Sequence, residues 1–306
     1  MQMSESPSRV VLSGASGMLG GSLRRALEAL GIPTLQLVRS ATALQGQLAW
    51  NPAVKPALAD PAALEGCAAA VHLSGANVAG HRWTASYRRE MISSRVDSTR
   101  ALASLLAGLR NPPRTLLVAS AVGFYGDRGD ELLDETSPPG KGFLAGLCGQ
   151  WEAAAQPAVE AGIRVVHLRL GVVLGPGPGA LARMLPHFRL GFGGRLGNGR
   201  QWMSWISLED AIRAVLFALE TPALDGPVNL TAPHPVTNAE FTHELARQLR
   251  RPAFLPAPAF ALRLALGQMA DEALLASARA VPSRLLAAGF RFAHPTVDKA
   301  LAATLS

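Results

Sequence analysis

Residues Val10 to Gly20 combine an apolar, β-branched run with three glycines spaced Gly14-x-x-Gly17-x-x-Gly20. A stretch with leucines at near-helical spacing follows at residues 18–30. A strand that enters a glycine turn and then a helix brings bare backbone to the positive end of that helix, where N–H groups can receive phosphate oxygens. Because the strand and helix that this motif requires are both present, we favour a dinucleotide-phosphate site over a turn without ligand. The expected phosphate contacts are Gly14, Ser16, Gly17, Met18 and Leu19.

Composition limits the kind of protein and its partners. The chain has 306 residues, of which 49% are hydrophobic and 17% charged, enough to bury a large core in two domains. Its formal net charge is +7, but the basic residues form no long run with interleaved aromatics, so we expect an anionic cofactor and no nucleic acid. Cys67 and Cys148 give neither a disulfide framework nor metal-ligand spacing, and we expect no metal. No apolar run reaches the roughly 18 residues of a membrane span. A cytoplasmic protein without a membrane partner is expected.

Strand-like and helical stretches alternate through the first half of the chain. This alternation predicts an α/β fold with a doubly wound, Rossmann-like parallel sheet, helices on both faces and ligand at the carboxyl ends of the strands. The predicted strands are residues 9–12, 34–38, 69–73, 115–119 and 164–168, and the predicted helices are residues 18–30, 86–109 and 144–160.

The pattern changes after Gly171, where glycine and proline become frequent. We assign residues 1–173 to the dinucleotide-binding domain and expect residues 206–230 to return to it, with a last strand at 228–230. Residues 174–205 and 231–306 are assigned to a substrate or lid region and a smaller, mainly helical C-terminal domain. Helical stretches are expected at 181–189, 206–219, 237–249, 260–269 and 283–288.

The end of the second predicted strand indicates which nicotinamide cofactor is bound. In dinucleotide folds an acidic side chain here binds the ribose 2′-hydroxyl of NAD, whereas an arginine suits the 2′-phosphate of NADP. Arg39 offers a planar, charged fork, and no Asp or Glu stands beside it. We therefore predict NADP(H) rather than NAD, with Arg39 and Ser40 as contacts. The alternative is an arginine that only caps the strand in solvent.

Other strand ends carry small or hydroxyl residues. Leu73 ends the third predicted strand, and Ser74 and Gly75 follow it. Small side chains here let a flat ligand approach the backbone, although a plain exit from strand to loop is an equally good interpretation. Ser120 follows the fourth strand, where a hydroxyl can hydrogen-bond a substrate carbonyl or hydroxyl.

Four segments together resemble the extended short-chain dehydrogenase/reductases, the NAD(P)-dependent epimerase/dehydratase relatives. They are the glycine turn, the run from His72 to Asn77, the run from Val118 to Gly126 and the run from Leu168 to Val173. The chain is most similar to an atypical branch of epimerase-family proteins with largely unassigned substrates and a small C-terminal domain of their own. The motifs typical of that branch are Arg82-Trp83-Thr84 through Ser94-Arg95, Gly191–Gly194, Gln201–Ile206 and Gly289–Phe292.

The resemblance covers nearly the whole chain and implies a cofactor lying across the strand ends. It implies a nicotinamide near Ser120, Tyr125 and the turn at 171–173, and we take Ser120 and Tyr125 as candidate catalytic residues. Arg95 is expected to hold phosphate, with Glu90 one turn earlier; a surface salt bridge between the two is the alternative. The other cofactor contacts that the resemblance implies are Leu73, Ser74, Gly75, Ala119, Gly171 and Val172.

One feature of the wider superfamily is missing. Its members use Tyr-x-x-x-Lys, whose lysine lowers the pKa of the tyrosine so that the phenol can pass a proton at neutral pH. Neither of the two tyrosines here has a lysine four residues later. Aligned on Trp151-Glu152, the two positions fall at Leu144 and Cys148, and neither side chain can perform that role.

Residues 195–205 combine flexible glycines with polar and aromatic side chains. Such a mixture suits a lid over a small-molecule substrate, with Arg200, Trp202 and Trp205 as contacts. Tryptophans that pack the domain junction are the alternative.

The leading hypothesis is an NADP(H)-binding oxidoreductase, a monomer or homodimer, that acts on a small carbonyl or hydroxyl compound without the usual relay. Two alternatives remain open. One is a protein that has lost catalysis and senses NADP(H), in connection with cell division as for some relatives. The other is a redox-neutral epimerase or dehydratase of the nucleotide-sugar type that keeps its cofactor bound.

Overall fold

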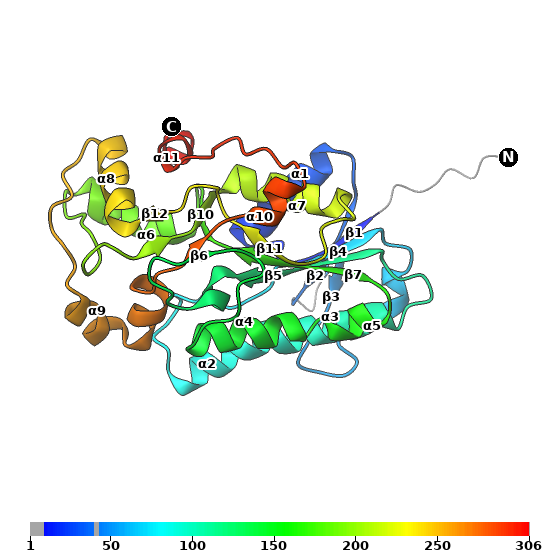
Figure 1. Ribbon diagram of the computed structural model, residues 1–306. Helices are drawn as coiled ribbons and strands as arrows, with labels where there is room; N and C mark the ends of the chain where they lie inside the picture. Colours follow the sequence, from blue (N-terminus) through cyan, green and yellow to red (C-terminus); the bar gives the residue numbers. More distant parts are fainter. Residues whose placement is uncertain (1–8, 40–42, 306) are drawn as a thin grey trace.

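A seven-stranded parallel sheet forms the centre of the computed structural model, which describes residues 9–39 and 43–305 (Figure 1). The strand order is β11-β7-β5-β4-β1-β2-β3, so the winding reverses between β1 and β4. The predicted α/β, doubly wound fold is confirmed, whereas Ser40 lies outside the described residues. The strands are β1 (Val10–Ser13), β2 (Thr34–Val38), β3 (Gln47–Ala49), β4 (Ala69–His72), β5 (Thr115–Ala121), β7 (Arg164–Leu170) and β11 (Gly226–Leu230).

Helices cover both faces of this sheet (Figure 1). Strands β1 and β4 are buried along their whole length, as expected for strands between two helical layers. One layer holds α1 (Met18–Ala29), α7 (Leu208–Glu220) and α10 (Ser283–Ala287). The other holds α2 (Ala85–Ile92), α3 (Ser98–Ala107), α4 (Phe143–Ala153) and α5 (Gln156–Glu160).

The two long predicted helices are each interrupted. The stretch predicted over 86–109 consists of α2 and α3 joined by a π-helical turn, Ser93–Asp97. The stretch predicted over 144–160 consists of α4, which ends at Ala153, and α5, which begins at Gln156. Pro157 stands in the first turn of α5. Proline is favoured at a helix start because the N–H it lacks would have no partner there. The sequence also failed to indicate β3, a three-residue edge strand with little burial.

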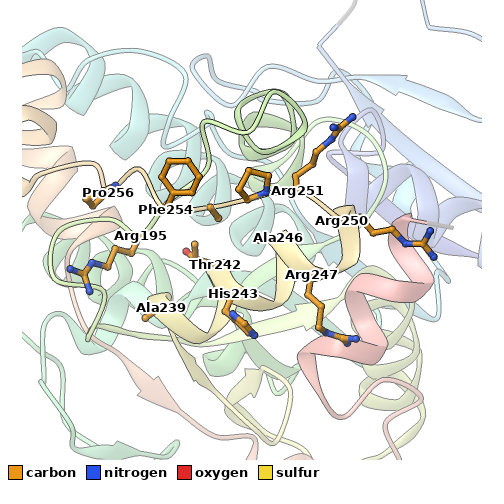
Figure 2. A pocket seen from close by; sticks show the side chains of 12 residues that line it. Arg195, Ala239, Thr242, His243, Ala246, Arg247, Arg250, Arg251, Phe254 and Pro256 are labelled. Carbon is orange, nitrogen blue, oxygen red and sulfur yellow. The ribbon is translucent and has the colours of Figure 1, made fainter.

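The C-terminal region forms a smaller body with its own core. Trp205, Phe241, Leu245 and Leu301 pack together there. Helix α8 turns a face bearing Thr242 toward a surface cavity (Figure 2). The region's elements are β8 (Val172–Leu174), α6 (Ala180–Arg189), β9 (Trp202–Met203), β10 (Trp205–Ser207), β12 (Val236–Thr237), α8 (Asn238–Leu249), α9 (Ala259–Leu266), η4 (Ala270–Leu274) and α11 (Val297–Leu305). Two further short elements, β6 (Leu132–Leu133) and β13 (Arg279–Ala280), pair with each other, and η3 (Val122–Tyr125) follows β5.

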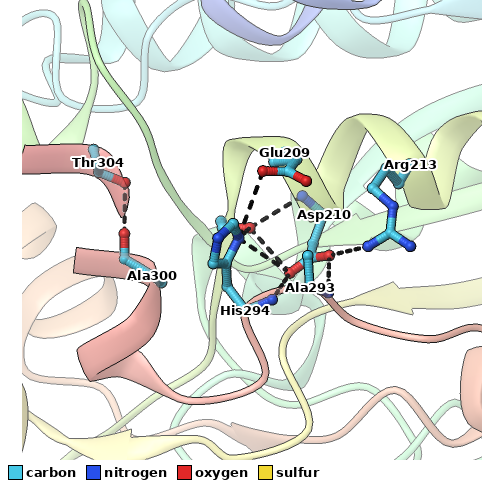
Figure 3. Close-up of polar contacts among 8 residues, drawn as sticks. Glu209, Asp210, Arg213, Ala293, His294, Ala300 and Thr304 are labelled. Carbon is cyan, nitrogen blue, oxygen red and sulfur yellow. Dashed lines mark hydrogen bonds and ion pairs between the residues drawn. The ribbon is translucent and has the colours of Figure 1, made fainter. Parts of the chain in front are cut away.

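A buried carboxylate joins the C-terminal segment to the sheet layer (Figure 3). Asp210, in the first turn of α7, is fully buried and accepts hydrogen bonds from the backbone N–H groups of Ala293 (2.7 Å) and His294 (2.8 Å). It also accepts from Nη1 of Arg213 (2.9 Å) and the hydroxyl of Ser207 (3.1 Å). These four donors converge on one carboxylate, which fixes where the chain leaves α10 and approaches α11.

Replacing Asp210 with alanine should destabilise the protein by about 3 kcal/mol, because buried donors would lose a charged acceptor. Urea denaturation would measure the loss. The matched control is Glu209→Gln, whose side chain is 61% exposed, and it should change the unfolding free energy by less than about 0.5 kcal/mol. Equal effects of the two variants would contradict the role assigned to Asp210.

Candidate functional site

The turn between β1 and α1 is built from very close backbone approaches. Gly14 has a φ of +75°, and a Cβ there would lie 2.7 Å from the carbonyl carbon of Leu73, the residue after β4. A Cβ on Gly20 would lie 2.2 Å from the carbonyl oxygen of Gly14. Only glycine fits at these two positions, and the fit places the start of α1 at the reversal point of the sheet, where ligands bind in folds of this kind.

The first turn of α1 is open to a ligand. Gly17 is the N-cap residue, no side chain in the described part of the chain caps the helix, and no acidic residue stands in its first turn. Ser16 and Gly17 are exposed, whereas Met18 and Leu19 are half-buried. Backbone N–H groups and the helix dipole therefore offer a site suited to phosphate. The predicted phosphate contacts are brought together here.

The predicted contacts after β4 pack against Arg95. Gly75 is exposed, and a Cβ on it would lie 3.1 Å from Cζ of Arg95. Arg95 is buried in the π-helical turn, donates from Nη2 to the carbonyl of Ala76 (2.7 Å), and lies over the ring of Trp151. In this structure its guanidinium holds the loop after β4, and its contact with phosphate stays a prediction.

Arg39 and Glu90 lie at the surface. Arg39 directly follows β2 and is exposed, the position expected for a contact with an adenosine 2′-phosphate. Glu90 on α2 is exposed, and no ion pair joins it to Arg95 in the described part of the chain. The alternative of a Glu90–Arg95 salt bridge is therefore wrong for this structure.

Behind the strand ends, a buried ion pair organises the two candidate catalytic residues. The carboxylate of Glu152 on α4 accepts two hydrogen bonds from the guanidinium of Arg169 on β7, from Nε at 2.8 Å and from Nη2 at 2.9 Å. The hydroxyl of Ser120 donates to the same carboxylate at 2.7 Å. Nη1 of Arg169 donates to the phenol oxygen of Tyr125 at 3.0 Å, and the phenol donates to Oδ1 of Asn229 at 2.7 Å.

This network occupies the hydroxyls that were predicted to act on substrate. Ser120 is 2% exposed and Tyr125 is fully buried. Burial raises the pKa of the Tyr125 phenol, and the nearby Arg169 offsets this only in part. Both hydroxyls therefore join strand ends to α4 and β11 in this structure, and substrate contact by either one stays a prediction. Sequence reasoning missed Glu152 and Arg169, although an arginine inside the apolar strand 164–170 signals a buried partner.

Leu144 and Cys148 lie side by side where the proton relay was expected. A Cβ on Gly123, in η3 after β5, would lie 3.5 Å from Cβ of Leu144 and 3.9 Å from Sγ of Cys148. Burial raises the pKa of the Cys148 thiol to about 12, so it is neutral at pH 7. An uncharged thiol supplies no ammonium charge, and leucine has no transferable proton.

The start of α4 receives its cap from the C-terminal region. The carboxylate of Glu272 accepts the backbone N–H groups of Phe143 (3.0 Å) and Leu144 (2.7 Å). The N-cap residue, Gly142, has no side chain and adopts a φ of +106°. A carboxylate at this end is favoured by the helix dipole, so residues far apart in sequence share one helix terminus.

The predicted lid residues do not gather on one cavity. Trp205 is fully buried, its indole N–H donates to the carbonyl of His234, and it packs in the C-terminal core. Its contact with a substrate stays a prediction. Trp202 is half-buried, donates to Asp130 (2.8 Å) and lies under the guanidinium of Arg279. Arg200 is exposed. The burial of Trp205 agrees with the alternative interpretation, in which tryptophans pack the interior.

The remaining predicted contacts lie at two strand ends. Ala119 is buried on β5. Gly171 directly follows β7, and a Cβ there would lie 2.7 Å from the carbonyl oxygen of Ser204. Val172 begins β8, which pairs with β10. In the residues that the structure describes, no three His, Cys, Asp or Glu side chains are grouped to hold a metal ion. No described helix has the length and apolar character to cross a membrane.

Comparison with known proteins places the fold and the glycine turn in one family. The model of the NAD dependent epimerase/dehydratase family matches residues 10–230. The chain belongs to that family. A second model, a domain of unknown function, matches residues 257–304 of the C-terminal region. The resemblance stated from the sequence is therefore confirmed.

Relatives in this epimerase family match along nearly the whole chain. An epimerase family protein of Mycobacterium bovis is 48% identical over 292 residues, which cover 95% of this chain and 96% of the relative. A bovine epimerase family protein is 36% identical over 297 residues, covering 96% of this chain and 98% of the relative.

Solved structures give the same result. The human epimerase family protein SDR39U1, crystallised with NADPH, superimposes with a TM-score of 0.88 at 34% identity, covering 97% of this chain and 98% of that one. A nucleoside-diphosphate sugar epimerase from Corynebacterium glutamicum gives a TM-score of 0.80 at 35% identity, covering 98% of this chain and 58% of the other.

For this family member we expect Tyr125→Phe to lower the unfolding free energy by about 1–2 kcal/mol, because Arg169 and Asn229 lose a buried partner. Glu152→Ala should cost more, about 3–5 kcal/mol, because it leaves the charge of Arg169 buried and unpaired. Chemical denaturation would measure both losses. A larger loss for Tyr125→Phe than for Glu152→Ala would contradict the central place given to the ion pair.

Proposed function

We propose that this protein binds NADP(H) across the carboxyl ends of β1, β4, β5 and β7. The observation that carries this proposal is the start of α1, which no side chain of the described residues caps and which lies at the reversal point of the sheet. The backbone around Gly14 and Gly17 would hold the pyrophosphate, and Arg39 the adenosine 2′-phosphate. The NADPH bound to the human relative supports this choice.

The residues fit such a cofactor at both ends of its nucleotide part. Gly17 and Ser16 are exposed. Among the described residues, a Cβ on Gly17 would come within 4 Å only of the carbonyl oxygen of Gly14, so ligand oxygens can approach this backbone. Arg39 has no acidic neighbour on β2 that would repel a phosphate. When bound, a nicotinamide cofactor supplies hydride transfer, and the protein supplies orientation.

We further propose an oxidoreductase-type protein that acts on a small carbonyl or hydroxyl compound without a Tyr-x-x-x-Lys relay. Leu144 and Cys148 supply no proton relay, and Ser120 and Tyr125 are committed to the Glu152–Arg169 pair. A reaction at this site would therefore take its proton from water or from the substrate itself.

The same committed hydroxyls favour a second candidate, an NADP(H)-binding protein that senses the cofactor without turnover. NADPH oxidation on a broad carbonyl panel separates the two. Oxidation that depends on substrate supports the oxidoreductase, and saturable binding without oxidation supports the sensor. A nicotinamide that stays bound through purification and does not exchange would instead support the redox-neutral epimerase.

Replacing Arg39 with Asp should weaken NADPH binding about 10- to 100-fold, because a charge-assisted bond to the 2′-phosphate is lost and a like charge replaces it. NADH affinity should change much less. Calorimetric titration with both cofactors measures this, with Arg110→Asp as the control for net charge, since Arg110 is exposed near the opposite ends of the strands. Unchanged NADPH affinity in Arg39→Asp would refute the assignment.

A further inference from the structure

A cavity of about 650 Å³ opens on the C-terminal region, between α8 and the segment that follows it (Figure 2). Its floor contains the small side chains of Ala239, Thr242 and Ala246, which share one face of α8. Arg195 and Phe254 form part of the opposite wall. The residues that line it include none from the β1–α1 turn or the strand ends, so this cavity is separate from the proposed cofactor site. Its volume is in the range of small-molecule sites.

The lining of this cavity is strongly basic. Four arginines and His243 contribute to it, and its lining residues include no Asp or Glu. Arg247 pairs with Glu244 at 2.6 Å. The other three, Arg195, Arg250 and Arg251, have no ion pair with any described residue. In Figure 2 the guanidinium groups of Arg247, Arg250 and Arg251 extend outward on one side of the cavity, and that of Arg195 lies on the other side. Together they create a positive potential that an anion would relieve.

The backbone of Arg250 is a second indication. It has a φ of +53°, and among the described residues no other non-glycine residue has a positive φ. This position ends α8, where glycine or asparagine adopts the left-handed conformation at much lower cost. An arginine kept in such a conformation beside a cavity points to a function for its side chain.

An exposed aromatic ring completes the site. Phe254 is 73% exposed on the wall formed by residues 251–256. A ring held at the mouth of a basic cavity can cover a planar group while arginines on the rim bind phosphate oxygens through paired N–H bonds. A second copy of this chain would bring arginine against arginine, which disfavours self-association through this surface.

We propose that this cavity binds a phosphorylated small molecule of the nucleotide class. Arg250 and Arg251 bind the phosphates from the end of α8, Arg195 approaches from the opposite wall, and Phe254 contacts the planar part. A bound ligand bridges α8 to the loop at 193–197, which already pairs with the segment at 255–257. The site is independent of the proposed cofactor site and does not require that proposal to hold.

The test is calorimetric titration of the full-length protein with ATP and with inorganic triphosphate, in the absence and presence of saturating NADPH. Saturable ATP binding that survives NADPH is expected. The Arg250→Ala/Arg251→Ala double variant should weaken it about 10- to 100-fold. The control double variant, Arg110→Ala/Arg114→Ala, removes two exposed arginines elsewhere and should bind as the parent does.

Two single variants sharpen the test. Arg250→Gly relieves the left-handed strain, so it should raise the melting temperature while weakening ATP binding. This combination separates a binding role from a loss of folding. Phe254→Ala should weaken ATP several-fold more than it weakens triphosphate, whereas Phe260→Ala, equally exposed at 73% but outside the cavity, should affect neither.

Several outcomes overturn the proposal. The proposal fails if ATP titration gives no saturable heat, or if NADPH competes with ATP for binding. It also fails if Arg39→Asp, rather than Arg250→Ala/Arg251→Ala, abolishes ATP binding. Equal loss of ATP affinity in the control variant Arg110→Ala/Arg114→Ala would contradict it as well. Binding to vesicles of anionic phospholipid that depends on Arg250 and Arg251, without binding of ATP or triphosphate, also overturns it and assigns the surface to a membrane. Failure of NADPH to bind at all leaves the ATP titration readable and counts only against the proposed cofactor site.

Discussion

The ion pair between Glu152 and Arg169 is the interaction on which the site region depends. It lies behind the strand ends, joins α4 to β7 and, through Ser120 and Tyr125, connects both to β5 and β11. The guanidinium also lies 3.5 Å over the ring of Phe124, so its charge is compensated by one carboxylate, one phenol and one aromatic face. Such a pair adds less to stability than its charges suggest, but losing one member is costly. Its main effect is to fix the positions of four elements at once.

The two halves of the candidate site differ in character. The nucleotide half has open backbone, exposed small residues and an arginine at the surface. The half where the nicotinamide is expected has Leu144, a neutral thiol and hydroxyls that already have partners. The turn between β1 and α1 therefore suits a nucleotide, whereas the region where the nicotinamide is expected has few groups that could transfer a proton.

The sequence predicted what depends on local pattern. Strand β2 was placed at its observed bounds, and the glycine turn was assigned to the correct β–α junction, because apolar runs and glycine spacing are local signals. The interruption at Ser93–Asp97 and the edge strand β3 were missed, since neither leaves a periodic signal. For Trp205 the sequence predicted a lid contact rather than burial, because a tryptophan near glycines gives the same sequence pattern in a lid and in a core. The Glu152–Arg169 pair joins residues 17 apart in sequence whose side chains meet only after the sheet has formed.

The cap on α4 has a consequence for how the two parts of this molecule are inherited. Residue 142 is a glycine without a capping side chain, and the missing acceptor comes from Glu272, 130 positions later. The segment matched by the C-terminal family model is thus a structural component of the helical layer that covers the parallel sheet, and not an interchangeable appendage. Chimeras that exchange this segment between relatives will preserve the start of α4 only when the donor sequence supplies a carboxylate at the corresponding place.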